Sequence, residues 1–483
     1  MKICTAQECR ESEARFIESN GVSVTDLIWR AAEAILKEIS GLVSPGATVR
    51  FACGGGNNGA DGVAAATLAC RAGYKATCHF LTEEVDLSPS LKSFVDEARA
   101  LEVRLEFGAR HLQEPCDLWV DALLGTGASG QLRPPTLHAI KAMNSSATKI
   151  LAVDIPSGLH PDTGGDMGDH IRAHATVTFV SPKRGFFQGH GPGAVGNLTV
   201  ADIGIPETQN ACPQLLSPAD ISLPSRRDDS HKGSTGRVLV KAGSKMMPGA
   251  AVLVVHAALR MGAGLVTLHA DQEVREIVAH HHPECVFLDS SAEIDGDKFD
   301  SAVFGPGLSL DEGVGASLEG IWKAWRKPCV IDADALTWVA RGVSLPQAPV
   351  VMTPHPKEMS RLIGMPMEEI LEKRFDAVEE CARKFGCTAI LKGRFTIVSE
   401  PESVAYVNPT GNSGMATGGM GDVLSGVIAA LLAQGVRPGE AAKAGVFLHG
   451  LAGDLCRDLI GEFGYLASEV ADHLPLARAK LRA

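Results

Sequence analysis

Short apolar stretches alternate with amphipathic ones along most of the chain. In the first half, the apolar stretches predict strands at residues 48–53, 75–81, 118–123, 149–154 and 175–180. The amphipathic stretches between them predict helices at 61–73 and 87–100, and residues 11–40 predict two more helices ahead of the first strand. Alternation of this kind is typical of an α/β fold, in which helices cover both faces of a parallel sheet.

The alternation breaks at residues 207–229, which are rich in Pro, Ser and Asp and show no period. Such a segment predicts a linker. A strand pattern resumes at 237–242, and the alternation then continues to a helical C-terminus. We therefore expect two different α/β domains, residues 1–212 and 229–483, joined by a linker at 213–228.

Charge and cysteine content narrow the range of functions. The chain of 483 residues has a net charge of −12 and lacks a long Lys/Arg cluster, which argues against a nucleic-acid surface. Twelve cysteines without a C-x-x-C pair indicate reduced thiols. Cys4 and Cys9 are close enough in sequence to bridge, but we favour a charged, irregular N-terminus. Neither a signal peptide nor a membrane-spanning run is evident, so we expect a cytoplasmic protein.

A glycine-rich stretch in the second half predicts an anion site. Six glycines lie between Gly411 and Gly426, and a long apolar helix pattern follows. A glycine loop that leads into a helix directs free N–H groups and the positive end of the helix dipole at one point. Asp422 lies in the first turn, where a carboxylate is suited to taking a proton from a hydroxyl. The alternative is that Asp422 only caps the helix.

A second glycine loop follows the first predicted strand. The stretch 54–62, GGGNNGADG, formally matches a dinucleotide fingerprint. However, Asn57, Asn58 and Asp61 place polar side chains where a pyrophosphate would contact bare backbone. They suit a sugar, an amide or a small cation better. A further match that begins at Gly191 leads into a strand-like segment, so we interpret it as a turn.

Two carboxylates end neighbouring predicted strands. Asp121 precedes the loop 125–131, and Asp154 precedes Ser157. Ligands of parallel sheets bind beyond the carboxyl ends of strands, so we expect both acids in one crevice with Asn58 close by. One acid then serves in acid/base chemistry while the other binds a cation. The alternative is that both only cap helices or hold loops.

The motifs GGGNNGADG, DALLGTG and AVDIPSGL resemble the N-terminal epimerase domain of the bifunctional NAD(P)H-hydrate repair enzymes. The motifs HKGSTGRVLVKAGS, FGPGLS, DADAL, TPHPKEM, LKGRFT and NSGMATGGMGD resemble the ADP/ATP-dependent dehydratase of the same family. The resemblance covers nearly the whole chain apart from the linker. It implies a Rossmann-like three-layer domain followed by a ribokinase-like domain. It also implies epimerisation of the hydrated nucleotide NAD(P)HX and its nucleotide-dependent dehydration.

For the first domain, the resemblance implies a potassium ion held by Asn58, Asp121 and Ser157. Asp154 would contact the substrate and is the expected proton-transfer group. Ala60 stands where the family commonly has glycine, and its Cβ could narrow the loop and impair epimerisation. The residues expected to hold the hydrated nucleotide with Asp154 are Asn57, Asn58, Gly59, Ala60, Asp61, Gly125, Thr126, Gly127, Ala128, Ser129, Gly130 and Gln131.

For the second domain, the resemblance implies Asp422 at the reacting hydroxyl and Mg²⁺ with the adenine nucleotide. The other residues expected at the hydrate pocket are Ala250, Gly307, His355, Pro356, Lys357, Glu358, Met359, Ser360 and Arg361. The residues expected at the nucleotide are Lys392, Gly393, Arg394, Phe395, Thr396, Asn412, Ser413, Gly414, Met415, Ala416, Thr417, Gly418, Gly419, Met420 and Gly421.

Other charged residues leave alternatives open. Asp332 and Asp334 end a predicted strand and form either a magnesium or substrate site or a structural element. Lys183 and Arg184 contact phosphate or belong to a solvated turn. The adjacent histidines at 280–282 diverge, so a polar helix end is favoured over a metal site.

The expected partners are small molecules, namely NADHX, NADPHX and ADP or ATP, with ADP preferred by resemblance. We expect a homo-oligomer that binds neither nucleic acid nor membrane. Two other functions remain open. One is a small-molecule kinase of the hydroxymethylpyrimidine or thiazole type fused to a ligand-sensing domain. The other gives the first domain only a binding or assembly role.

Overall fold

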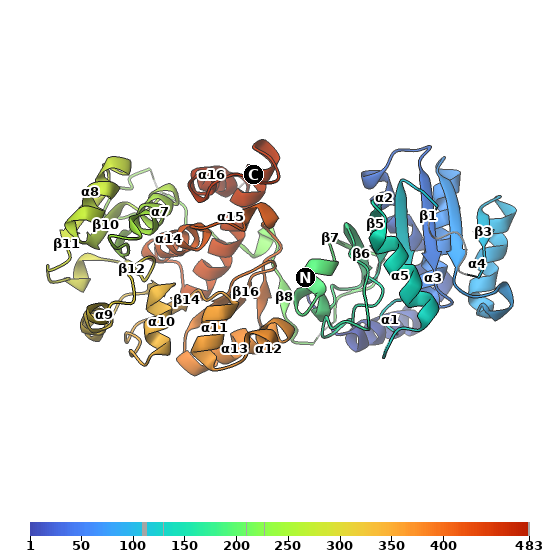
Figure 1. The fold of residues 1–483 in the computed structure, drawn as a ribbon, viewed down its shortest axis with the longest axis horizontal. Coiled ribbons are helices and arrows are strands. Elements are labelled where there is room, and N and C mark those ends of the chain that lie inside the picture. The colour runs from blue at the N-terminus through green and yellow to red at the C-terminus, as the bar shows by residue number, and fades with distance from the viewer. Residues whose placement is uncertain (109–113, 129, 209, 227, 482–483) are drawn as a thin grey trace. The chain divides into compact units, whose positions relative to one another are not determined.

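The computed structural model describes residues 1–483 except 109–113, 129, 209, 227 and 482–483. The chain divides into two compact units, Met1–Cys212 and Pro213–Ala483. Each unit is built around one sheet with helices packed on it (Figure 1). The α/β fold with two different sheets, predicted from the sequence, is confirmed.

The first unit contains a seven-stranded sheet of order β3-β2-β1-β4-β5-β6-β7, in which all neighbouring strands are parallel. Its strands are β1 (Thr48–Cys53), β2 (Lys75–Phe80), β3 (Arg104–Glu106), β4 (Leu118–Ala122), β5 (Lys149–Val153), β6 (Ala175–Phe179) and β7 (Asn197–Ala201). The chain reverses its direction of travel across the sheet between β1 and β4. Such a switch point is where open α/β sheets bind their ligands.

Helices cover both faces of this sheet. They are α1 (Ala6–Asn20), α2 (Val24–Leu42), α3 (Asn57–Arg71), α4 (Pro89–Ala100), α5 (Pro134–Ser145) and α6 (Gly191–Ala194). One face is closed by α2, α3 and α4, which share a buried apolar cluster with Phe51 and Val120. The other face is closed by α5, which packs against Trp119. The apolar core on both faces holds the carboxyl ends of the strands in place.

The second unit contains a ten-stranded sheet of order β11-β10-β9-β12-β13-β14-β15-β16-β17-β8, in which only the β15-β16 and β16-β17 pairs are antiparallel. Its strands are β8 (Gln214–Leu215), β9 (Arg237–Lys241), β10 (Leu265–Ala270), β11 (Val286–Asp289), β12 (Ser301–Phe304), β13 (Cys329–Ile331), β14 (Val350–Met352), β15 (Thr388–Leu391), β16 (Ile397–Ser399) and β17 (Tyr406–Val407). β8 lies in the stretch predicted as a linker and pairs with β17, so this stretch contributes to the second sheet.

Helices also cover both faces of the second sheet. They are α7 (Pro248–Arg260), α8 (Gln272–His281), α9 (Glu312–Ala324), α10 (Asp334–Ala340), α11 (Pro356–Ile363), α12 (Met367–Glu372), α13 (Arg374–Phe385), α14 (Met420–Ala433), α15 (Pro438–Leu459) and α16 (Ala467–Lys480). α7, α14, α15 and α16 share one buried cluster with Val303 of β12. The next residue, Phe304, points to the opposite face and packs against Trp322 of α9.

Two predictions about local structure need correction. Helix α3 begins at Asn57 rather than at residue 61, so Asn57 and Asn58 lie in its first turn and not in the loop. The N-terminus is not irregular, because Thr5 caps α1 and the thiols of Cys4 and Cys9 are buried. Both cysteines are free thiols.

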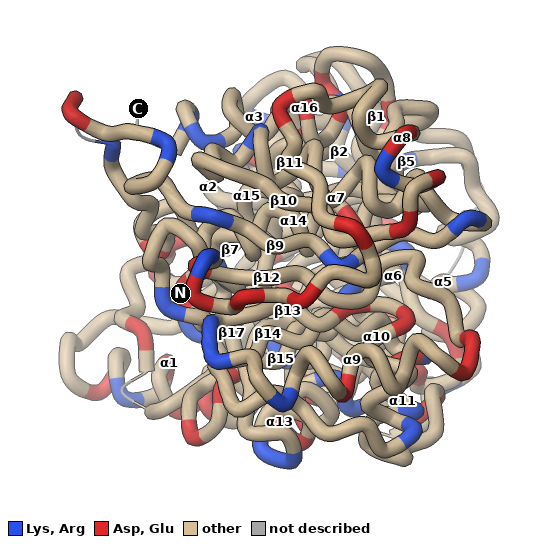
Figure 2. Tube along the Cα trace, turned by 90° about the vertical axis from the view of Figure 1, so that its left-hand side faces the viewer, with Lys and Arg blue, Asp and Glu red and all other residues tan. Residues whose placement is uncertain are grey.

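Charged residues of both signs are interspersed along the segments that face the viewer in Figure 2. Acidic residues exceed basic ones by twelve over the whole chain. Within the described residues, no helix is long and apolar enough to cross a membrane.

Candidate active sites

The carboxyl ends of β1, β4 and β5 bring three predicted site residues together. β1 leads into Asn58, β4 carries Asp121, and Asp154 follows β5 directly. A Cβ added to Gly125, just after β4, would lie 3.3 Å from Asn58 Cβ and 3.5 Å from Asp154 Oδ2. The glycine at 125 therefore keeps space open between the amide and the carboxylate.

Asp121 is fully buried, and its described contacts are with neutral donors. Ser157 donates from Oγ to Asp121 Oδ1 at 2.6 Å and from its backbone N to Oδ2 at 2.8 Å. The backbone N of Leu123 donates to Oδ1 at 3.3 Å. Burial raises the pKa of Asp121 to about 6, although these hydrogen bonds oppose the shift. A buried carboxylate with only neutral neighbours is a good ligand for a cation.

The Asn58 side chain is buried, and neither its Oδ1 nor its Nδ2 has a hydrogen-bond partner among the described residues. An unpaired buried polar group costs roughly 1–3 kcal/mol. Such groups persist in folded proteins where a ligand, an ion or a water satisfies them. The amide of Asn58 is therefore placed to bind something other than the protein.

Asp154 is paired with a buried lysine. Lys183 Nζ lies 2.5 Å from Asp154 Oδ1 and also donates to Thr178 Oγ1 at 2.6 Å. Lys183 is only 1% exposed, so the alternative that it belongs to a solvated turn is wrong. Asp154 has φ of +62°, a left-handed conformation that is uncommon for residues other than glycine and clusters at functional sites. The lysine fixes the direction of this carboxyl group.

The glycines after β1 permit close backbone packing. A Cβ added to Gly54 would lie 1.9 Å from the carbonyl oxygen of Leu123, and one added to Gly59 would lie 1.9 Å from that of Gly54. Neither position tolerates a side chain. Ala60, by contrast, is buried in the apolar cluster under α3. Its Cβ faces the core, so it does not narrow the loop.

The remaining predicted residues of the first site surround this centre. Asp61 is partly buried, and burial together with the charges of Asp154 and Glu13 raises its pKa well above the usual range. The protonated carboxyl that this shift favours can donate a hydrogen bond. The carbonyl oxygen of Thr126 accepts from Arg10 Nη1 at 2.9 Å, which anchors the loop 125–131 to α1. Ser129 of this loop lies outside the described residues.

In the second unit, a buried ion pair forms at the carboxyl ends of β13 and β15. Lys392 Nζ lies 2.9 Å from Asp332 Oδ1 and 3.8 Å from Glu358 Oε2. Ser425 of α14 donates to Asp332 Oδ2 at 2.8 Å. Burial opposes the charged form of the lysine, but Asp332 and Glu358 outweigh it and raise the pKa of Lys392. This cation is therefore held in place by the protein before any anion binds.

Asp422 lies beside this pair, in the first turn of α14. Burial and the negative charge of Asp332 raise the pKa of Asp422 to about 7, against the lowering effect of Lys392. A Cβ added to Gly421 would lie 3.2 Å from Lys392 Nζ, so the start of α14 directly contacts the lysine. A carboxylate with a pKa close to neutral is poised to exchange protons.

The loop that leads into α14 is braced from α15 and from Tyr465. Asp454 accepts from Asn412 Nδ2 and from the backbone N of Gly411, both at 2.9 Å. Asn412 Oδ1 accepts from Tyr465 and, at 3.0 Å, from the backbone N of Gly414. This bracing leaves the predicted nucleotide loop, residues 412–421, with a defined backbone.

The residues predicted at the hydrate pocket come from two places, the contact between Gly307 and Ala250 and the stretch 355–361 at the start of α11. Gly307, with φ of +65°, lies against Ala250, because an added Cβ would be 2.8 Å from Ala250 Cβ. In the stretch 355–361, His355 Nδ1 accepts from the backbone N of Lys357 and of Glu358 and so caps α11. Met359 is fully buried. From this stretch, the structure brings Glu358 to Lys392, while His355 has a capping contact and Met359 a core position.

The loop 392–396 is held by a buried arginine of α13. Arg374 donates to the carbonyl oxygens of Arg394 at 2.9 Å and of Phe395 at 3.0 Å. Thr396 Oγ1 donates to the carbonyl oxygen of Gly393 at 2.9 Å. The loop is therefore anchored by its carbonyl groups.

The sequence interpretation did not identify Ser425 or His449, and it considered Lys183 without pairing it with Asp154. Lys183 and Ser425 hold Asp154 and Asp332 by contacts across the sheet, and the sequence carries no local signal of such pairing. His449 of α15 is buried, its Nε2 has no described partner, and burial lowers its pKa to about 4. The positive charge of Lys392 contributes to this shift. The signal that could have identified His449 is its place within the apolar stretch 444–453.

Comparisons with known proteins bear on both units. The model of the family described as YjeF-related protein N-terminus matches residues 24–185, and that of NAD(P)H-hydrate dehydratase matches residues 238–476. A crystal structure of the ADP/ATP-dependent NAD(P)H-hydrate dehydratase from Bacillus subtilis, co-crystallised with ATP and Mg²⁺, is similar at 31% identity with a TM-score of 0.52. The alignment covers 57% of this chain and 100% of that chain.

Curated relatives extend the similarity over the full chain. A bifunctional NAD(P)H-hydrate repair enzyme from Coxiella burnetii is 36% identical over 97% of this chain and 97% of its own length. One from Escherichia coli K12 is 35% identical over 96% of this chain and 92% of its own length. With both family modules in the order of these relatives, the chain belongs to the family of bifunctional NAD(P)H-hydrate repair enzymes, with an epimerase module followed by a dehydratase module.

Proposed function

We propose that Asp422 and Asp154 are the proton-transfer groups of the dehydratase and the epimerase, respectively. The second unit would dehydrate the S epimer of NADHX and NADPHX with ADP or ATP as phosphoryl donor. The first unit would interconvert the R and S epimers. The observation that carries the proposal is Asp422, whose pKa of about 7 and place in the first turn of α14 put a proton acceptor beside a fixed cation.

The dehydration requires a better leaving group than hydroxide. The hydrated ring carries a hydroxyl on a carbon next to nitrogen. Asp422 takes the hydroxyl proton while the oxygen attacks the terminal phosphorus of the nucleotide, which leaves AMP or ADP. The ring nitrogen then donates its lone pair, the C–O bond breaks, and phosphate departs. Loss of a proton from the neighbouring carbon restores the double bond of NAD(P)H.

Lys392 and the start of α14 supply the charge that the transferring phosphoryl group needs. The N–H groups of residues 418–421 and the positive end of the helix dipole favour an anion there. Both oxygens of Asp332 are engaged by Lys392, Ser425 and the backbone N of Ala333, which supports a role in positioning Lys392. We place Mg²⁺ with the nucleotide phosphates, because the B. subtilis relative was crystallised with ATP and Mg²⁺.

In the first unit, Asp154 would assist the reversible loss and return of the ring hydroxyl. Its Oδ1 is held by Lys183, and its Oδ2 faces Gly125, where the substrate is expected. The nearby amide of Asn58 and the partly buried Asp61 offer polar contacts for the carboxamide and the ribose. A planar intermediate formed at this point can be rehydrated from either face, which exchanges the epimers.

A potassium ion fits the oxygens of Asn58, Asp121 and Ser157. Asp121 is a buried carboxylate with neutral donors, and Asn58 Oδ1 is buried without a described partner. An amide, a carboxylate and a hydroxyl form an all-oxygen set, which suits a hard cation. When bound, K⁺ would supply positive charge that keeps Asp121 ionised and orients the substrate.

We propose ADP as the phosphoryl donor by resemblance to the two-domain members of the family, since backbone loops recognise phosphates without fixing their number and do not choose between ADP and ATP. The proposed location is the cytoplasm, because all twelve cysteines are free thiols, as a reducing compartment would keep them. A small-molecule kinase is the competing function for the second unit. It would accumulate a stable phosphorylated product, whereas the repair reaction releases phosphate.

Two substitutions test the proposal. In an assay that separates the epimers of hydrated NADH, Asp422→Ala should lose nucleotide-dependent dehydration by at least about 10²-fold and keep epimerisation. Asp154→Ala should repair one epimer only. Dehydration that persists in Asp422→Ala would refute its role. Equal repair rates for both epimers in Asp154→Ala would remove Asp154 from the mechanism.

A further inference from the structure

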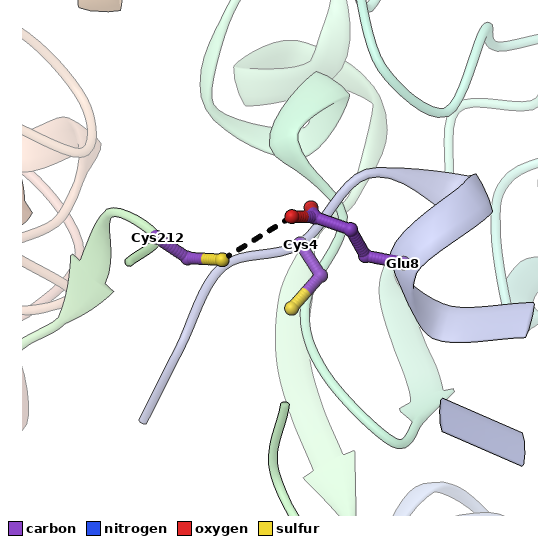
Figure 3. Close-up of side chains that lie close together, drawn as sticks. All are labelled: Cys4, Glu8 and Cys212. Atoms are coloured by element: carbon purple, nitrogen blue, oxygen red, sulfur yellow. Dashed lines mark hydrogen bonds between the residues drawn. The ribbon is translucent and has the colours of Figure 1, made fainter. Parts of the chain in front are cut away.

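The start of the chain meets the end of the first unit at a cluster of cysteines outside both proposed active sites. Cys4, Glu8 and Cys212 each offer a ligand atom, and these atoms all lie within 4.8 Å of one another (Figure 3). Both thiols are buried, at 2% and 4% exposure. Among the residues that the structure describes, this is the group of three His, Cys, Asp or Glu side chains that meets the spacing of a metal site.

The ligand atoms already lie at distances from one another that are typical of a metal site. Cys212 Sγ lies 3.6 Å from Glu8 Oε1. In a tetrahedral zinc site, with Zn–S of about 2.3 Å and Zn–O of about 2.0 Å, sulfur and oxygen ligands lie about 3.5 Å apart. Little movement of either side chain is therefore needed to coordinate zinc.

The carboxylate of Glu8 is oriented by contacts of its own. Thr5 donates to Glu8 Oε2 from its backbone N and from Oγ1, both at 2.9 Å, which forms the cap of α1. Asn210 Nδ2 donates to Oε1 at 3.2 Å. One oxygen is thus committed to the cap, and the other is fixed toward the thiols. Hydrogen bonds that fix a ligating side chain are typical of metal sites.

The segment that carries Cys212 is fastened to the chain start. Lys2 Nζ donates to the carbonyl oxygens of Thr208 at 2.7 Å and of Asn210 at 2.8 Å. Cys9 lies in the same buried cluster as Cys4 and Cys212. These contacts hold the segment of Cys212 against the chain start that carries Cys4 and Glu8.

We propose that Cys4, Glu8 and Cys212 form a zinc-binding site that joins the two ends of the first unit. Two sulfur ligands and one oxygen select a thiophilic divalent cation, and a water completes the tetrahedron. Binding forms two Zn–S bonds and one Zn–O bond and releases the protons of both thiols to solvent.

The site also supports the segment that carries Lys183. The backbone N of Cys4 donates to the carbonyl oxygen of Pro182, and that of Arg184 donates to the carbonyl oxygen of Cys4, both at 3.0 Å. The bound ion would hold Cys4, and through it the backbone on both sides of Lys183. The binding test below does not depend on the role proposed for Asp154.

The test uses the full chain, freed of metal with a chelator and kept in a reducing agent that does not bind zinc. Zn²⁺ is titrated against a chromophoric chelator, and Co²⁺ is added separately to record sulfur-to-metal charge-transfer absorption. The variants are Cys212→Ser and Glu8→Gln, the second of which keeps the helix cap. The matched control is Cys70→Ser, a partly buried cysteine of α3 outside the cluster.

The proposal predicts one Zn²⁺ per chain and thiolate absorption with Co²⁺ in the wild type and in Cys70→Ser. Cys212→Ser should bind Zn²⁺ more than about 100-fold more weakly. Loss of a residue that only hydrogen-bonds to a metal ligand weakens the affinity by about 10- to 100-fold, so a larger loss identifies Cys212 as a ligand. Glu8→Gln should lower the affinity while retaining the charge-transfer band. Absence of stoichiometric binding in the wild type, or equal affinity in Cys212→Ser, would overturn it. So would a Cys4–Cys212 or Cys4–Cys9 disulfide, found by mass spectrometry, in protein that takes up no metal.

Discussion

Asp422 shows how neighbouring charges tune one side chain. It is buried beside the negative Asp332, which favours its protonated form, and near the positive Lys392, which favours the carboxylate. Burial and Asp332 prevail, and the pKa rises to about 7. An ordinary aspartate would be a weaker base, because its conjugate acid gives up the proton too readily.

The dehydration rate should therefore depend on pH through Asp422. The general base acts as the carboxylate, so kcat/KM for the S epimer should fall about tenfold per pH unit below about pH 7 and level off above it. Rates from about pH 5 to pH 9 at saturating nucleotide would record the profile. Lys392 stays positively charged throughout this range, because its pKa is raised. The pH dependence therefore reports the titration of Asp422. A flat profile across neutral pH would contradict the assignment of Asp422 as the base.

In the first unit, Lys183 and Asp154 form a comparable buried ion pair. Lys183→Met should destabilise the first unit by roughly 3–5 kcal/mol, because it removes one partner of a buried ion pair and leaves Asp154 without it. Denaturant unfolding of the full chain, followed by tryptophan fluorescence, would measure the change in the transition of the first unit, which carries Trp29 and Trp119. Lys149→Met, at the exposed start of β5, is the matched control and should stay within about 0.5 kcal/mol of the wild type. Equal stability of the two variants would show that the ion pair contributes little.

The acidic site residues were easier to identify from the sequence than the side chains that form hydrogen bonds or ion pairs with them. Asp121 lies near the end of one apolar strand, Asp154 directly follows another, and Asp422 follows a glycine loop, so their positions carry a local signal. Lys183 comes after β6, where its sequence context predicts a turn. Its contact with Asp154 depends on the adjacency of β5 and β6, which only the fold provides.

Helix α3 and the loop before it act as one element. The loop brings the backbone of Gly54 against Leu123 and that of Gly59 against Gly54, so that α3 starts directly behind the switch point. This packing places Asn58 in the first turn of α3, close to Gly125. The fingerprint-like glycines therefore allow close backbone contact between this loop and the end of β4.

Gly59→Ala should disrupt this element. Its added Cβ would meet the Gly54 carbonyl oxygen at 1.9 Å, so the loop must move, and overpacking of this kind costs about 1–3 kcal/mol or more. We expect a lower melting temperature and loss of epimerisation, with dehydration of the S epimer retained. Gly55→Ala is the control in the same loop, because a Cβ there meets nothing within 4 Å. Similar behaviour of the two variants would mean that the close contact is unimportant.

Element types were predicted better than element ends. The period of the apolar residues defines β1, β4, β5 and β6 to within one or two residues, because a buried strand has a strict pattern. The start of α3 was missed because Asn57 and Asn58 are common in loops, whereas tertiary packing extends the helix through them. β8 was missed because two residues, Gln214–Leu215, leave no period to detect.

The whole chain combines two sites with complementary demands. The dehydratase site is chiral and accepts one configuration of the hydrated carbon, so the other epimer would persist without the first unit. In the function proposed above, the dehydratase site uses a phosphoryl donor, whereas the epimerase site would use a cation held by oxygen ligands. Family membership explains why both occur in one chain, and the geometry explains how each could act.

The most direct test follows recovery of NADH absorbance from separated R and S epimers of hydrated NADH, with the full chain and with or without ADP or ATP. The account predicts full recovery from both epimers only when a nucleotide is present, with release of phosphate. Without nucleotide, each epimer should convert into a mixture of the two. Failure to recover absorbance in every condition, or accumulation of a phosphorylated product, would contradict the account.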